Sequence, residues 1–137
     1  MALTHLVDTS ALTRLRDSSV RARILEGASQ SVLAITSLSH LVLGYSARSA
    51  QEWDEISASL ESLRTVEIVD ADVQSALRVQ RELAARGLRG RKLVDLFIGA
   101  TALRLKLTVL HYDRDFDHIA AVTGQRCEWI APAGSLD

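Results

Sequence analysis

The amino-acid sequence predicts an α/β domain in which helices cover both faces of a central, mainly parallel sheet. Three observations lead to this expectation. Short apolar runs alternate with segments of helical periodicity, two of these runs end in carboxylates, and one helical segment is apolar on nearly every side. Such alternation is typical of parallel sheets, which bind ligands beyond the carboxyl ends of their strands.

The first half of the chain begins with an apolar run at residues 3–7, which predicts a strand that ends at Asp8 and leads into a helix. A second helix is expected at residues 20–26, where Gly27 should end it. The strand at residues 31–36 and the β-branched run at residues 65–69 enclose two segments of helical spacing, residues 37–47 and 53–63.

The second half starts with a helix that runs to about residue 85 and that Asp70 or Asp72 could cap. A basic turn at residues 86–92 leads into a helix at residues 93–105, whose apolar character on nearly all sides predicts that it is buried. The remaining elements are expected to be a strand at residues 108–110, a short helix through residues 119–122, a strand at residues 127–130 and a frayed tail at residues 132–137.

Composition is that of a soluble globular domain, with 47% hydrophobic and 24% charged residues in a chain of 137. The net charge of −1 neither demands nor excludes a polyanionic partner, and the few aromatic residues argue against stacking on bases as the main binding mode. The single Cys127 fits a reducing compartment. No signal peptide or bilayer-spanning run is recognisable, so we expect a cytoplasmic protein without membrane contact.

Acidic residues follow two of the predicted strands. Asp8 ends the first strand, and Asp113, Asp115 and Asp117 come within seven residues of the strand at 108–110. If these strands are parallel neighbours, Asp8 and Asp113 share one edge of the sheet. Asp95 lies near the start of the buried helix, where an ionised carboxylate is costly unless it is paired or binds a metal.

Each acid also has a purely structural interpretation. Asp8 could cap the first helix, Asp95 could satisfy N–H groups in the first turn of its helix, and Asp115 could be a solvated charge. For Asp117 the solvated interpretation is preferred. Taken together, acids at one sheet edge with no His or Cys cluster favour Mg²⁺ or Mn²⁺ over zinc. Carboxylate-bound Mg²⁺ usually serves phosphate chemistry.

Positive charge is expected beside these acids, in the basic turn that precedes Asp95. Its cations are Arg86, Arg89, Arg91 and Lys92, with Arg14, Arg16 and Arg48 as further candidates. They could contact the phosphates of a nucleic acid or belong to a solvated loop. Ser10 lacks the surroundings of a hydrolase nucleophile and could instead hydrogen-bond a metal-bound water. The four histidines show no metal-ligand spacing.

Three motifs carry a family resemblance across essentially the whole chain. They are the opening Leu-Val-Asp-Thr-Ser-Ala, the segment Lys-Leu-Val-Asp-Leu-Phe-Ile-Gly-Ala and the closing Val-Leu-His-Tyr-Asp-Arg-Asp-Phe-Asp-His-Ile-Ala. In order and spacing the chain resembles the PIN domain, and particularly the VapC toxins of bacterial toxin–antitoxin pairs. The resemblance implies a single PIN domain over residues 1–137, with a three-layer α/β/α sandwich.

The resemblance also implies a Mg²⁺- or Mn²⁺-dependent endoribonuclease, inhibited by a VapB-type antitoxin. Such a protein is usually a homodimer, and forms a heterotetramer or larger assembly with its antitoxin. By the family pattern Asp8, Asp95 and Asp113 are the metal-site acids, and Asp115 is a frequent fourth contributor.

One position departs from that pattern. The family normally has a glutamate four or two residues before the glycine of the Gly-Tyr-Ser-Ala-Arg stretch at residues 44–48, and here these positions hold His40 and Val42. Val42 is the preferred register. Losing one metal-shell carboxylate would lower metal affinity and activity but leave the fold intact, unless Asp115 replaces the missing acid.

Three functions therefore compete. The leading hypothesis is a metal-dependent endoribonuclease toxin, and the second is a catalytically impaired PIN-like module that binds antitoxin or RNA without cleaving it. The third is a receiver-like phosphoacceptor domain, although Asp8 has no adjacent acid and Lys106 precedes the strand that such a fold would require it to follow.

Overall fold

The computed structural model describes residues 2–88 and 92–136. Over these residues the chain forms, in order, β1 (His5–Val7), α1 (Thr9–Leu12), α2 (Ser18–Ser29), β2 (Leu33–Thr36), α3 (Ser37–Gly44), α4 (Ala50–Ser59), β3 (Arg64–Val66), α5 (Asp70–Ala85), α6 (Leu93–Leu105), β4 (Thr108–His111), α7 (Asp115–Thr123) and β5 (Cys127–Trp129). The strands and helices expected from the sequence are all present, with shifted ends.

The strands form one sheet in the order β3-β2-β1-β4-β5, and every neighbouring pair is parallel. The sheet is therefore fully parallel rather than mainly parallel. The direction in which strands are added reverses between β1 and β4, which pair with Leu6 opposite Val109 and Val7 opposite Leu110. Crevices at such a reversal are where open α/β sheets bind ligands. The order also differs from the 2-1-3-4-5 order of receiver domains, which removes the receiver-like alternative.

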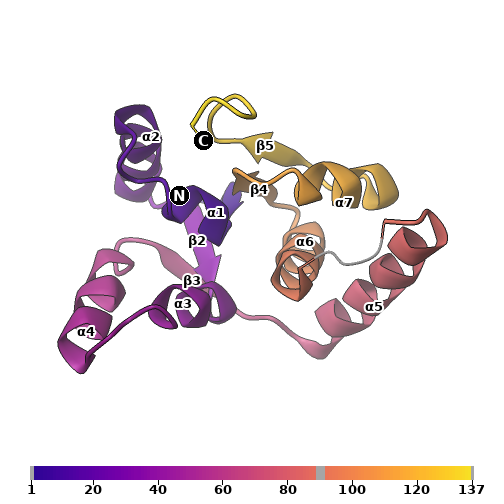
Figure 1. Cartoon of the computed structure of the whole chain (residues 1–137), viewed down its shortest axis with the longest axis horizontal. Coiled ribbons are helices and arrows are strands. Elements are labelled where there is room, and N and C mark those ends of the chain that lie inside the picture. Colours follow the sequence, from indigo (N-terminus) through magenta and orange to yellow (C-terminus); the bar gives the residue numbers. More distant parts are fainter. Residues whose placement is uncertain (1, 89–91, 137) are drawn as a thin grey trace.

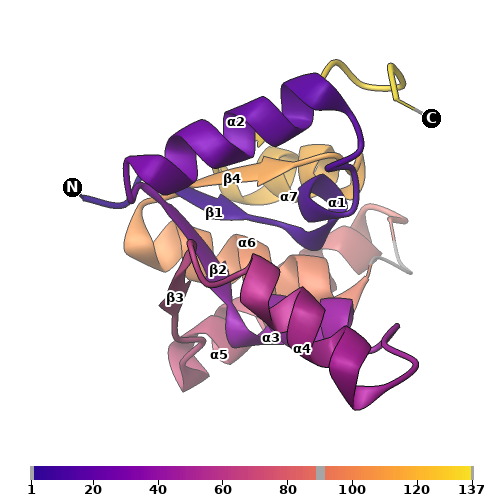
Figure 2. The ribbon, with the colours of Figure 1, turned by 90° about the vertical axis from the view of Figure 1, so that its left-hand side faces the viewer.

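Helices cover both faces of the sheet and make three layers. In Figure 1, α5, α6 and α7 lie on one side of the strands and α1 to α4 on the other. Figure 2 shows α2 above β4 and β1. Neighbouring residues of a strand serve opposite layers, because their side chains alternate between faces. Leu6 and Val109 pack with α5, α6 and α7, whereas Val7 and Leu110 pack with α1 and α2.

Gly27 does not end α2, contrary to the expectation from the sequence. The helix continues to Ser29, and the chain turns at Ser31, whose φ is +57°. A Cβ atom on Gly27 would lie 2.6 Å from Leu33 Cδ1 in β2. The glycine is therefore explained by close packing of helix on sheet, which local sequence reasoning interpreted as a breaker.

Asp72 has a larger role than the expected helix cap. It lies in the first turn of α5 and accepts a hydrogen bond from the Val69 N–H, but it is also buried. Arg104 near the end of α6 donates to it through Nε at 2.8 Å, and the Thr101 hydroxyl donates at 3.2 Å. Asp72 thus links the start of α5 to the end of α6.

The tail contacts the rest of the domain instead of fraying over its described part. The Leu136 N–H donates to the Tyr112 hydroxyl at 2.9 Å, and Leu136 packs against a small cluster that includes Val20 and Ala131.

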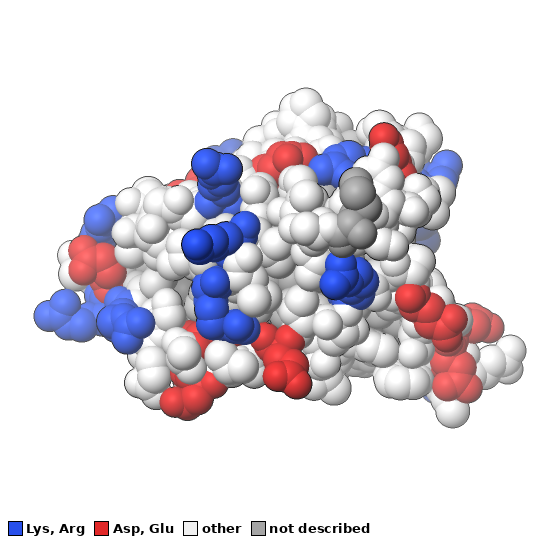
Figure 3. Space-filling view, turned by 180° about the vertical axis from the view of Figure 1, so that it is seen from behind, with Lys and Arg blue, Asp and Glu red and all other residues white. Residues whose placement is uncertain are grey.

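Charges of both signs occupy the surface. Seen from behind, Lys and Arg side chains gather in several groups with acidic side chains beside and below them (Figure 3). Among the described residues, no helix has the length and apolar character needed to cross a membrane.

Candidate metal and phosphate site

Asp8 is placed by the end of β1 and the start of α1. Its N–H donates to Leu110 O of β4, and its carboxylate caps α1 by accepting from the Ser10 N–H at 3.0 Å. The Ser10 hydroxyl donates to the same oxygen, Oδ2, at 2.6 Å. The predicted cap is therefore present, yet it leaves the other oxygen, Oδ1, buried and without a hydrogen-bond partner in the described structure.

Asp113 and Asp115 follow β4 in the turn that leads into α7. Asp113 Oδ1 accepts from the Asp115 N–H at 2.9 Å, and Oδ2 accepts from Lys92 Nζ at 2.8 Å. Asp95 enters from the first turn of α6 and is only 3% exposed, and its Oδ2 has no partner among the described residues.

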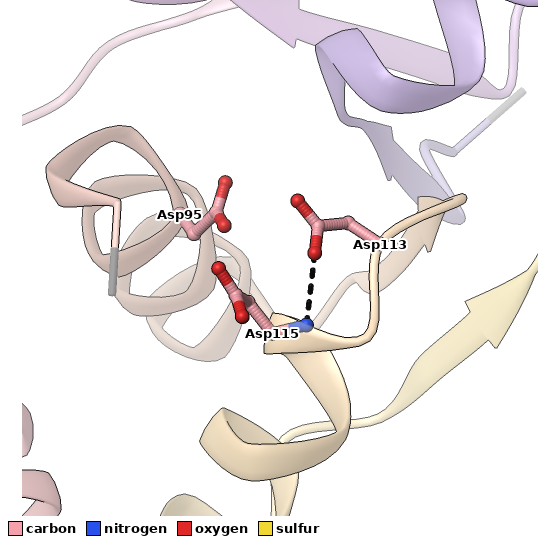
Figure 4. A group of neighbouring side chains, drawn as sticks. All are labelled: Asp95, Asp113 and Asp115. Carbon is pink, nitrogen blue, oxygen red and sulfur yellow. Dashed lines mark hydrogen bonds between the residues drawn. The ribbon is translucent and has the colours of Figure 1, made fainter. Parts of the chain in front are cut away.

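Three of these acids converge on one point. Asp95, Asp113 and Asp115 each offer a carboxylate oxygen, and the three oxygens lie within 4.8 Å of one another. Figure 4 shows their side chains pointing toward one another from α6, from the turn after β4 and from the start of α7.

Asp8 lines the same pocket, and its charge is the strongest of those acting on Asp95, although it is not one of the three acids whose oxygens lie within 4.8 Å of one another. The expected set of Asp8, Asp95 and Asp113 remains a prediction. Asp117 also lies outside the group of three, and accepts a hydrogen bond from Trp129 Nε1 at 3.1 Å.

The pocket around the acids has a volume of about 740 Å³. Its acids and cations lie side by side, because Arg14, Lys92 and Arg114 line it together with Asp8, Asp95 and Asp113. Size and charge together suit an extended, phosphate-bearing ligand.

Electrostatic repulsion and burial act on the carboxylates. Burial, and next the charges of Asp8 and Asp113, raise the pKa of Asp95 to about 8. Burial also raises the pKa of Asp8, against the hydrogen bonds from Ser10. Burial would raise the pKa of Asp113 as well, but the hydrogen bonds from Lys92 and the Asp115 N–H bring it below its usual value. A bound cation would relieve this repulsion.

Two side chains beneath the acids hold the turn in place, and the sequence singled out Ser10 but not His111. His111 is fully buried, and its Nδ1 accepts from the Asp113 N–H at 3.1 Å. The Ser10 hydroxyl accepts from the Tyr112 N–H at 2.9 Å, so it joins the turn after β4 to Asp8. That Ser10 also bonds a metal-bound water remains a prediction. The signal for His111 was its place at the end of an apolar strand, next to the acids.

Only some of the predicted cations lie beside the acids. Lys92 reaches Asp113, whereas Arg86 contacts Glu82 at 3.6 Å. Arg89 and Arg91 lie outside the described residues. Arg14 lines the pocket, donates to Ser10 O at 2.8 Å and lies over the Tyr112 ring. Arg114 was missed, although it stands between Asp113 and Asp115 in the sequence.

The two positions that lack the family's glutamate point in different directions. His40 stacks on Trp53 of α4, with ring centroids 5.3 Å apart. Val42 lies two residues further along α3 and lines the acidic pocket. Of the two registers, the one at Val42 is therefore the register that faces the acids, and an isopropyl group occupies that wall.

The donor set fits a hard divalent cation. All the converging ligands are carboxylate oxygens, which Mg²⁺ and Mn²⁺ prefer. The unpartnered, buried Oδ1 of Asp8 and Oδ2 of Asp95 are oxygens that a cation or its water ligands would satisfy.

Comparison with known proteins identifies the family of the chain. A family model described as the PIN domain matches residues 5–122. The chain is 46% identical to Ribonuclease VapC51 of Mycobacterium tuberculosis over 137 residues, covering 100% of both chains. It is 38% identical to Ribonuclease VapC18 of the same organism, over 95% of this chain and 97% of that protein.

Solved structures share the fold at lower identity. The crystal structure of VapBC2 from Rickettsia felis, bound to a DNA fragment from its promoter, contains a chain with a TM-score of 0.76 and 19% identity, covering 94% of this chain and 99% of that one. A toxin–antitoxin complex from Klebsiella pneumoniae gives a TM-score of 0.71 at 17% identity, covering 93% and 98%. With the sequence relatives matched along their whole length, the chain belongs to the PIN domain family and, within it, to the VapC ribonucleases.

Proposed function

We propose that this protein is the toxin of a type II toxin–antitoxin pair and acts as a metal-dependent endoribonuclease. The observation that carries the proposal is the convergence of Asp95, Asp113 and Asp115 within 4.8 Å, at the strand-order reversal of the sheet. The names of the sequence relatives support the reaction class, and the convergence of the acids supports this pocket as the site of the reaction.

Asp95, Asp113 and Asp115 would hold the cation, with Mg²⁺ or Mn²⁺ as the best candidates. When bound, such an ion lowers the pKa of a water ligand and stabilises negative charge on a phosphoryl oxygen. Asp8 lines the same pocket and its charge acts on Asp95 more strongly than that of Asp113, so we assign it to the cation directly or through the water shell that Mg²⁺ usually keeps. Ser10 orients Asp8 by bonding its Oδ2, which leaves Oδ1 to accept a proton or a hydrogen bond from water.

The cations of the pocket would bind the RNA backbone. Lys92, Arg14 and Arg114 line it beside the acids and supply charge for phosphates on either side of the scissile bond. Phosphate contacts of this kind need no base specificity.

An antitoxin is the proposed protein partner. Two solved relatives with this fold are complexes of the VapBC or toxin–antitoxin kind. By the same resemblance we propose a homodimer, which forms a heterotetramer or larger assembly with the antitoxin.

The direct test is cleavage of a structured RNA by the purified protein with Mn²⁺. We expect cleavage that EDTA abolishes and that Asp95→Asn reduces by about a hundredfold, since loss of even an outer-shell partner of a metal ligand costs about 10- to 100-fold and Asp95 would be a direct ligand. If the wild-type protein leaves RNA intact with Mn²⁺, Mg²⁺ or no metal, the enzyme proposal fails.

The impaired binding module is the second candidate, and Val42 in the pocket is the observation that favours it. Val42→Glu adds a further carboxylate to the wall of the pocket that faces the acids. We expect tighter Mn²⁺ binding and cleavage raised about tenfold or more, because each added carboxylate strengthens a hard-cation site. Leu41→Glu, on the same helix but 69% exposed, is the matched control and should change neither. A Val42→Glu protein that still fails to cleave, yet binds antitoxin tightly, would favour the binding module.

A further inference from the structure

Lys92 provides a feature that the proposed function leaves unexplained. It directly precedes α6, and its ammonium contacts Asp113 Oδ2 at 2.8 Å although the side chain is 69% exposed. The other Asp113 oxygen already accepts the Asp115 N–H. Both oxygens of a proposed metal ligand are therefore occupied by groups of the protein itself.

The ammonium is also close enough to act on the whole acid group. Hydrogen bonding to Asp113, and beyond it the charges of Asp95 and Asp115, raise the pKa of Lys92 above its usual value. One positive charge thus offsets several carboxylates that would otherwise repel one another across the pocket. This is the electrostatic work expected of a bound ion.

A lysine ammonium and a divalent cation compete for Asp113 Oδ2. The ammonium donates directly to that oxygen, and a cation beside it would repel the ammonium at short range. Lys92 has a long, flexible and largely exposed side chain, so it can swing into solvent or toward a phosphate at little cost.

We propose that Lys92 is a built-in counter-cation which occupies the acid site until a divalent metal displaces it from Asp113, and which then contacts the RNA phosphate. The inference rests on the proposed function, because it takes Asp113 to be a metal ligand. It gives Lys92 two successive partners and makes the loading of the site depend on the free metal concentration.

The consequence for metal binding is opposite in sign to that of an ordinary supporting residue. A residue that positions Asp113 would weaken metal binding when removed. Removal of a competing ammonium should tighten it, by about three- to tenfold for one charge beside a partly exposed divalent site. The same removal should weaken RNA binding, because a contact with a phosphate is lost.

The sequence offers a matched control, since Lys92 and Lys106 are its two lysines. Lys106 is exposed at the opposite end of α6. Lys92→Met and Lys106→Met therefore remove the same charge at two places, and their difference separates the local effect from the change in net charge.

The primary experiment measures Mn²⁺ binding by electron paramagnetic resonance for the wild-type protein and both variants, with melting curves to verify folding. We expect Lys92→Met to bind Mn²⁺ three- to tenfold more tightly and Lys106→Met to stay within twofold of wild type. Equal or weaker binding by a folded Lys92→Met protein would overturn the counter-cation. A wild-type protein that binds no Mn²⁺ would instead overturn the metal site of the proposed function, so the two failures are distinguishable.

A second measurement follows the displacement itself. Isotopic labelling of lysine gives two side-chain signals in a nuclear magnetic resonance spectrum, which the Lys106→Met variant assigns. Added Mg²⁺ should move the Lys92 signal toward that of a solvated lysine and leave the Lys106 signal unchanged. A Lys92 signal that stays fixed while Mg²⁺ saturates the site would overturn the proposal. In cleavage assays Lys92→Met should need less metal and show a higher KM for RNA.

Discussion

At the scale of a single residue, Asp95 shows that ionising a carboxylate in this site is unfavourable in the folded protein. Burial together with Asp8 and Asp113 raises its pKa to about 8, far above the value of about 4 for an aspartate in an unfolded chain. The folded state therefore holds this proton more tightly than the unfolded state does. The contribution of Asp95 to stability is most favourable below pH 4 and is lost as the pH rises toward 8.

We expect Asp95→Asn to stabilise the metal-free protein, by an amount that grows between pH 4 and pH 8 and reaches a few kcal/mol. Melting curves in EDTA at pH 5 and pH 8 measure the difference between the two proteins. His111, whose pKa burial lowers to about 4, acts in the opposite direction over this range. It is common to both proteins and cancels in the comparison.

Mg²⁺ provides the control for this measurement. It should raise the melting temperature of the wild-type protein at pH 8 and have a much smaller effect on Asp95→Asn. Two proteins with parallel stability curves across this pH range would show that Asp95 ionises freely in the folded state.

At the scale of secondary-structure elements, an ion pair between α5 and α6 fixes the helix that carries Asp95. Asp72 is 1% exposed and accepts hydrogen bonds from Arg104, Thr101 and the Val69 N–H. Although burial opposes it, contact with Arg104 lowers the pKa of Asp72. Because α6 also carries Asp95, this ion pair holds the helix that delivers a site residue.

Arg104→Met should destabilise the fold by about 2–3 kcal/mol, because removal of one partner leaves a buried charge uncompensated. This estimate is below the roughly 3–5 kcal/mol typical of a broken buried ion pair, because Arg104 is partly exposed and Asp72 keeps two other hydrogen-bond donors. Urea denaturation measures it. Arg81→Met, which removes an exposed arginine of α5, should change stability by less than about 0.5 kcal/mol. A double variant with Asp72→Asn that recovers stability would identify the unpaired charge as the cause, and an Arg104→Met protein as stable as Arg81→Met would refute it.

Elements were easier to predict from the sequence than the site they carry. Periodicity and apolar runs located the strands and helices, because burial on one face imposes a repeat that a single sequence displays. The role of Gly27 was misjudged because the reason for a glycine there is close contact with Leu33, a residue on another element. The same reason limits the site: Asp8 and Asp113 could be named from their strand ends, but the convergence of Asp115 on Asp95 and Asp113 depends on packing.

At the scale of the whole molecule, the distribution of charge matters more than its sum. The net charge is −1, and groups of both signs share the surface (Figure 3). The proposed RNA binding would therefore depend on a few cations placed next to the acids, and among the described residues chiefly on Lys92, Arg14 and Arg114.

Three such cations predict a shallow salt dependence. For a single-stranded RNA the slope of log K against log salt should be about −2, from roughly 0.7 per phosphate contact. Fluorescence anisotropy in EDTA, which keeps the RNA intact, gives this slope across a range of KCl concentrations. A slope steeper than about −4 would indicate that cations elsewhere on the surface also bind the backbone.

The strand order has a last consequence, for the time at which the protein becomes active as it is made. Asp8 leaves the ribosome early, but its neighbouring strand β4 and the partner acids Asp113 and Asp115 are synthesised about a hundred residues later. Parallel pairing across such a distance forms late in folding. A nascent chain that ends before β4 has half of a site and no neighbour on that side of β1, so translation itself delays the nuclease until nearly the whole domain has emerged.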